Sequence, residues 1–139
     1  MKVEDCFKKQ LLIKKKQSLE KAQKSLDTAE VYIQKAKDNF KIKNYDIAIV
    51  VAYTSMFHSL RSILFKDGIK ERSHICLLSY IKDTYPELSG IVNSVDIYRR
   101  FRHTALYGLE TPEFQDEAET SIKIAREVYN TVEKKFLKI

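Results

Sequence analysis

The chain has 139 residues, the length of one ordinary domain. Its 44% hydrophobic and 32% charged residues are typical of a globular protein and exclude an intrinsically disordered one. Because it has only three glycines and two prolines, we expect long helices and few turns. We therefore predict a soluble all-α protein, an antiparallel bundle of four to five helices that forms a single domain over residues 1–139.

The positive charge is concentrated at the start of the chain. The net charge is +6, and the first 24 residues hold eight lysines against three acidic residues. We treat residues 1–16 as a basic N-terminal extension. Such a segment attracts phosphate backbones without reading a sequence, and the alternative is a solvated helix face.

The two cysteines, Cys6 and Cys76, are far apart and belong to no CxxC motif, so we expect no disulfide framework and a reducing cytoplasm. The first residues are charged and lack the apolar core of a secretory signal. The longest uncharged run, Ile47–Leu60, is fourteen residues, short of the ~20 that span a bilayer. We expect a cytoplasmic protein without membrane contact.

The first predicted helix covers about 5–41, and Lys14–Lys16 interrupts it, so its first turns bend away or form a separate piece. The second, about 44–66, is capped by Asn44 and ends at Gly68. It is apolar almost all round, which predicts burial by its own bundle or by a second subunit. The first helix has a heptad seam, typical of near-parallel packing, at Leu19, Ala22, Leu26, Ala29, Ile33, Ala36 and Phe40.

Three further helices complete the predicted bundle. The third starts at Ser73 and stops before Pro86, and the fourth runs over about 88–106 to Gly108. Thr111-Pro112-Glu113 starts the fifth, with a capping hydroxyl followed by proline. The apolar stripe of the fifth helix consists of Phe114, Ala118, Ile122, Ala125, Tyr129, Val132 and Phe136.

Most enzyme signatures are absent: the sequence has no glycine-rich phosphate loop, HExxH, CxxC or GxSxG. His58, His74 and His103 are scattered, a pattern more typical of ordinary histidines than of metal ligands. We therefore predict no metal and no cofactor.

The segment Asp96–Gly108 holds three arginines and a histidine within five residues. On a helix Arg102 falls in line with the apolar Ile91, Val95, Tyr98 and Leu106, whereas Arg99 and His103 point elsewhere. An arginine on an apolar stripe is ion-paired, reaches to water, or lines a cleft. A cationic cleft suits phosphate, because the guanidinium is a rigid fork of donors.

Two segments, Ala52-Tyr-Thr-Ser-Met-Phe-His-Ser-Leu-Arg61 and Arg102-His-Thr-Ala-Leu-Tyr-Gly108, resemble the HEPN family, "higher eukaryotes and prokaryotes nucleotide-binding" helical domains. The likeness covers residues 17–137 and is strongest to the small prokaryotic members. It implies a bundle that dimerises. Active members are metal-independent endoribonucleases with Arg, four to six residues, then His, and some are toxins neutralised by a small nucleotidyltransferase.

Here Arg102 occupies the place of the motif arginine, but Tyr107 stands where the shortest form of the motif has histidine. Histidine exchanges protons near neutral pH and tyrosine does not. We predict a homodimer that binds RNA, nucleotide or a partner protein with little or no nuclease activity. The alternatives are an active endoribonuclease that uses His103, and a purely structural interaction module. The catalytic candidates are Arg102, His103 and Tyr107; the binding candidates are Arg99, Arg100, Arg102 and Tyr107.

Overall fold

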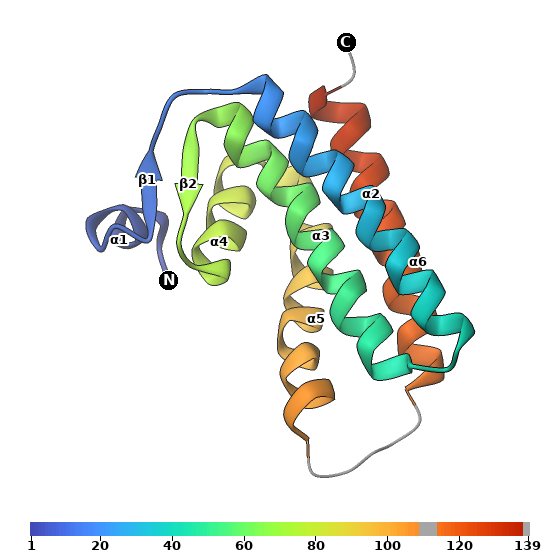
Figure 1. Cartoon of the computed structure of the whole chain (residues 1–139). Helices are drawn as coiled ribbons and strands as arrows, with labels where there is room; N and C mark the ends of the chain where they lie inside the picture. Colours follow the sequence, from blue (N-terminus) through green and yellow to red (C-terminus); the bar gives the residue numbers. More distant parts are fainter. Residues whose placement is uncertain (109–113, 138–139) are drawn as a thin grey trace.

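The computed structural model describes residues 1–108 and 114–137. Its helices are arranged as an antiparallel bundle, with a short strand pair and a small helix at one side (Figure 1). The elements in chain order are α1 Val3–Lys8, β1 Leu12–Lys14, α2 Leu19–Lys41, α3 Tyr45–Asp67, β2 Ile69–Glu71, α4 His74–Thr84, a 3-10 turn Pro86–Leu88, α5 Ser89–Tyr107, α6 Gln115–Val132 and a π-helical turn Glu133–Leu137.

The all-α prediction is confirmed, with one correction: residues 12–14 and 69–71 form a small antiparallel sheet that the sequence analysis did not anticipate. Ile13 pairs with Lys70 at its centre. The predicted first helix is accordingly divided, with α1 and β1 preceding the long α2. The lysine run that interrupted the helical pattern lies at this break.

The long helix α3 is the centre of the bundle and packs against α2, α4, α5 and α6. Its buried side chains cover most of its circumference, as its sequence predicted. By length and composition alone, α3 is long and apolar enough to cross a membrane, but the core helix of a globular protein can have the same length and composition. Most of the apolar segment of α3 is buried inside the bundle. Close contact with α2 is fixed by Ser55 and Ser62, whose hydroxyls donate to the carbonyls of Ala29 and Ala22.

The predicted stripes largely match the core. On α2 the seam residues from Ala22 to Ala36 are buried, but Leu19, the first residue of the helix, is 66% exposed. Asn44 occupies the cap position of α3, although its side chain makes no capping hydrogen bond. The predicted start of the last helix, Thr111–Glu113, lies outside the described residues.

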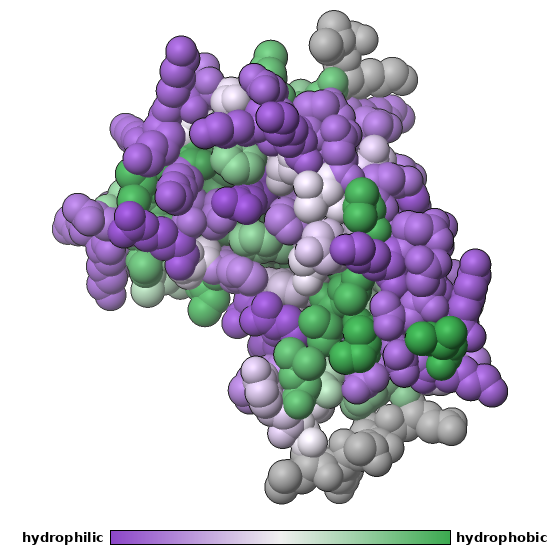
Figure 2. Space-filling view, viewed as in Figure 1, coloured by the Kyte–Doolittle hydropathy of each residue, from purple (hydrophilic) through white to green (hydrophobic). Residues whose placement is uncertain are grey.

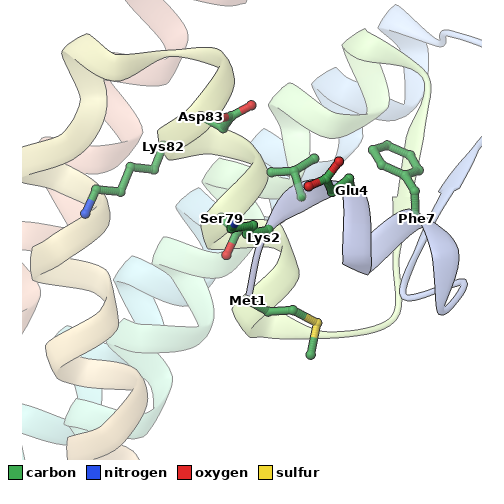
Figure 3. Close-up of a pocket in the computed structure, with 8 residues that line it drawn as sticks. Met1, Lys2, Glu4, Phe7, Ser79, Lys82 and Asp83 are labelled. Atoms are coloured by element: carbon green, nitrogen blue, oxygen red, sulfur yellow. The ribbon is translucent and has the colours of Figure 1, made fainter.

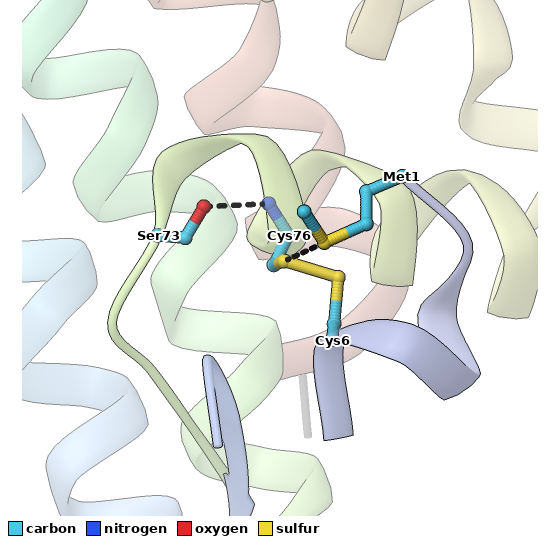
Figure 4. Close-up of a disulfide and its surroundings, with 4 residues drawn as sticks. All are labelled: Met1, Cys6, Ser73 and Cys76. Atoms are coloured by element: carbon cyan, nitrogen blue, oxygen red, sulfur yellow. Dashed lines mark hydrogen bonds between the residues drawn. A yellow bond between two sulfur atoms is a disulfide. The ribbon is translucent and has the colours of Figure 1, made fainter. Parts of the chain in front are cut away.

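Cys6 on α1 and Cys76 on α4 form a disulfide, which corrects the prediction of no disulfide framework (Figure 4). Sequence separation was a poor guide because β1 pairs with β2, the strand that leads into α4. Both cysteines are fully buried, and the thioether of Met1 lies 3.8 Å from the Cys76 sulfur. The basic extension is therefore packed onto the bundle along α1 and β1.

Candidate functional site

Arg102 lies on the α5 face that turns towards α3 and is half-buried, as its helical phase predicted. Its guanidinium carbon is 5.0 Å from the centre of the Tyr53 ring on α3, in a cation–π contact. Among residues 1–108 and 114–137, no carboxylate oxygen lies within 4.0 Å of this guanidinium. Within the described chain, the internal ion pair considered from the sequence is absent.

His74 lies against the same Tyr53 ring as Arg102. From its sequence context it was expected to be an ordinary histidine. Ser73 caps α4 by accepting a hydrogen bond from the Cys76 amide and so places His74 at the first position of that helix. The His74 ring stacks on Phe57, with ring centres 4.0 Å apart, and its Nδ1 is 2.5 Å from the Tyr53 hydroxyl. Three helices, α3, α4 and α5, thus contribute to one cluster: Tyr53, Phe57, His74 and Arg102.

The ionisation states follow from burial and charge. Burial raises the pKa of Tyr53 to about 12, against the opposing effect of Arg102. Burial, reinforced by Arg102 and Arg99, lowers the pKa of His74. Both groups are therefore neutral, and in the tautomer in which the phenol donates to Nδ1 the ring proton lies on Nε2. His74 can present that N–H to an anionic ligand.

The other predicted arginines are held by one carboxylate. Asp96 accepts a hydrogen bond of 2.8 Å from Arg99 Nε, and its other oxygen lies 3.5 Å from an Arg100 terminal nitrogen. Asp96 and Arg99 also line a hollow of about 230 Å³ between α4 and α5. Arg99 and Arg100 thus add positive potential beside Arg102, partly offset by Asp96.

His103 and Tyr107 are both exposed and lie against each other, with ring centres 5.0 Å apart. α5 stays helical through Tyr107, so the Tyr107 ring lies against His103, one turn earlier, and away from Arg102. Neither residue belongs to the cluster with Tyr53.

A larger hollow, of about 810 Å³, lies between α1 and α4 (Figure 3). Its lining mixes Lys2, Glu4, Lys82 and Asp83, so the charges offset one another. Within the described residues, no group of three or more histidine, cysteine or acidic side chains could hold a metal ion.

Partial burial lowers the pKa of both His74 and His58, with a further effect from Arg61 on His58. These two lowered pKa values predict how stability depends on pH. The unfolded chain takes up protons at about pH 6.5, before these folded-state histidines do. The free energy of unfolding is therefore highest above that pH and falls as the pH drops through the window below it. We expect the melting temperature to decline from about pH 7.5 to about pH 5.5, a range in which histidine dominates titration.

The matched variants are His74→Gln and His58→Gln, which cannot gain this proton. Each is expected to flatten the decline, and the double variant more than either one. His103→Gln serves as the control. A wild-type melting curve that shifts upward with acid would contradict the assignment.

Comparison with known proteins agrees with the sequence resemblance. A model of the HEPN domain matches residues 17–135, most of the chain, including α2 to α6 and the cluster around Arg102. No curated protein matches the chain significantly.

Proposed function

Because the chain belongs to the HEPN domain family, we propose that it binds RNA at the cluster of Arg102, His74 and Tyr53. The observation that carries the proposal is the state of Arg102. Its guanidinium rests on an aromatic ring, half-buried, with no carboxylate partner in the described chain. A phosphate group would supply the missing anion.

The chemistry of the cluster suits a phosphodiester. Arg102 offers paired N–H donors to two phosphate oxygens, a geometry that lysine cannot reproduce. His74 adds a donor from a second helix, and Arg99 adds positive potential. The exposed ring of Tyr107 offers a face on which a base can stack. This cluster is equally suited to the phosphate of a free nucleotide, which is the second ligand to test.

We also propose that the functional unit is a homodimer, since HEPN domains commonly form dimers. Exposed apolar side chains on α3 and α5, including Ile47, Leu106 and Tyr107, support a second copy as the partner. Figure 2 shows apolar surface gathered over the lower half of α3 beside the end of α5. A two-fold axis here would bring two Arg102 clusters towards each other.

Metal-independent RNA cleavage is the second candidate function, and the position of His74 favours it. A general acid or base must lie next to the cation that holds the phosphate. His74 shares the Tyr53 ring contact with Arg102, whereas His103 contacts Tyr107. In this alternative His74, and not His103, takes the place of the motif histidine.

As a finer proposal, the chain acts as the HEPN component of a toxin–antitoxin pair with a minimal nucleotidyltransferase, in the cytoplasm. This rests on the family resemblance alone. Copurification from the native host would identify such a partner.

The proposed function is tested by light scattering coupled to size exclusion, with and without single-stranded RNA, in buffer containing a chelator. We expect a dimer that carries RNA at low salt and releases it as salt rises. Intact RNA after incubation supports binding alone, and metal-independent fragments support cleavage. A monomer that retains no RNA at low salt would favour the purely structural module.

A further inference from the structure

A row of four side chains runs along α3 at steps of four residues: Tyr53, Phe57, Arg61 and Phe65. Each step advances about 6 Å and turns by about 40°, so the row forms one slanting stripe of ~18 Å. Its first end is the cluster already described, with Arg102 over Tyr53. At its other end the Arg61 guanidinium carbon lies 5.1 Å from the centre of the Phe65 ring.

At this second end lies a hollow of about 520 Å³. It is formed where the segment between β1 and α2 passes over the end of α3 and the start of β2. Its lining, among the residues that the structure describes, includes no acidic side chain. The lining consists of Lys15, Lys16, Lys21, Arg61, Phe65, Gly68, Ile69 and Lys70.

Within residues 1–108 and 114–137, most of the positive charge in this hollow has no acidic partner. Arg61 is paired with Glu71 at 3.1 Å. For the four lysines, the described chain has no carboxylate oxygen within 4.0 Å of any ammonium group. Like charges held close together destabilise the fold until an anion is bound, and concentrate phosphates from solution.

Backbone hydrogen bonds hold the segment that carries Lys15 and Lys16 against the end of α3. The Lys15 amide donates a 2.8 Å hydrogen bond to the Gly68 carbonyl, and the Ser18 amide donates to that of Phe65. Gly68 adopts φ +77°, and a Cβ there would meet the Lys15 carbonyl oxygen at 2.6 Å. The chain therefore crosses the end of α3 at van der Waals distance, with Lys15 and Lys16 fixed beside Arg61.

A second hollow of about 180 Å³ shares Lys21, Arg61 and Phe65 and continues between α2 and α3 to Lys24 and His58. Cations and aromatic rings thus alternate around Arg61. This combination is typical of surfaces that bind single-stranded nucleic acid, where cations follow the backbone and rings stack on bases.

We propose that the lysine hollow is a second binding site for the phosphate backbone of single-stranded RNA, with the strand following the α3 row to Arg102. The lysines neutralise phosphates, and the half-buried rings of Phe57 and Phe65 contact bases between the two sites. The proposal extends the proposed function, because it adds a distant set of contacts to the same ligand.

The test is equilibrium binding of a fluorescent single-stranded RNA of about ten nucleotides, a length within the ~4–16 nucleotides typical of single-strand sites. The variant is Lys15→Ala/Lys16→Ala, and the matched control is Lys37→Ala/Lys41→Ala, which removes the same charge from exposed positions of α2. We expect the first pair to weaken binding about tenfold and to lower the salt slope by about 1.4, or ~0.7 per lost contact. The control should change neither.

The outcomes separate the two proposals. If Arg102→Ala weakens RNA binding and the Lys15/Lys16 pair does not, the second site is refuted and the proposed function stands. If only the lysine pair weakens binding, the hollow is supported and the Arg102 cluster is refuted as an RNA site. Polyglutamate is titrated in parallel, because equal affinity and equal lysine dependence would assign the hollow to an acidic protein and overturn the RNA proposal.

Discussion

Replacing Cys6 or Cys76 with serine is expected to lower the free energy of unfolding by about 4 kcal/mol in the chain-entropy account of disulfides. The bond joins residues 70 apart in sequence, so it removes the entropy of a long loop from the unfolded chain. A domain of this size loses roughly 3 °C in melting temperature per kcal/mol, so the expected fall is ~10–15 °C.

The measurement is thermal unfolding of the wild type and of Cys6→Ser, each with and without dithiothreitol. We expect the reductant to lower the wild-type value to that of the variant and to leave the variant unchanged. A wild-type melting temperature that the reductant does not change would indicate that the two thiols are free, in agreement with the sequence-based expectation of no disulfide framework. The cytoplasmic location stays a prediction; in that compartment the pair would be kept reduced and the stability measured with reductant is the relevant one.

Arg102→Ala is expected to weaken RNA binding by about 10- to 100-fold, the effect of losing charge-assisted hydrogen bonds of ~1.5–3 kcal/mol. The melting temperature should fall by only ~2–6 °C, since the described chain gives Arg102 no acidic partner that its removal would leave buried. The loss of the Tyr53 contact costs about 0.5–2 kcal/mol. Binding and stability are therefore expected to separate.

Two companion variants make this result specific. Arg126→Ala removes the same charge from α6, where Glu30 holds the guanidinium by two hydrogen bonds, and should leave RNA binding intact. Arg102→Lys keeps the charge but not the fork and should restore binding only in part. A large fall in melting temperature with unchanged RNA affinity would instead make Arg102 a structural residue.

The sequence of the basic extension did not predict its structure. The pattern of residues 1–16 contains neither a long apolar period nor a turn signal, and three-residue strands are too short to leave one. β1 forms because β2 offers it a partner edge, 57 residues away. The disulfide follows from that pairing. Because α1 precedes β1 and α4 follows β2, the strand pair places Cys6 of α1 next to Cys76 near the start of α4.

Local patterns determined the helices, because helix formation depends on neighbours within a few residues. The helix ends predicted near residue 41, at Gly68 and before Pro86 agree with the structure, and the predicted start at Thr111 lies outside the described residues. Gly68 ends α3 in the left-handed conformation that its residue type favours. The same reasoning placed Arg102 correctly on the inner side of α5, because helical phase is also a local property.

The partners of Arg102 were decided only by the tertiary structure. Tyr53, His74 and Arg102 are separated by more than twenty residues at each step, and no spacing rule connects them. In the sequence His74 could not be distinguished from the other two histidines. In the structure, the cap of α4 and the packing of three helices place its ring against Phe57 and Tyr53. The residue types of this site were visible in the sequence, but their proximity depends on how α4 and α5 pack against α3, which no local pattern encodes.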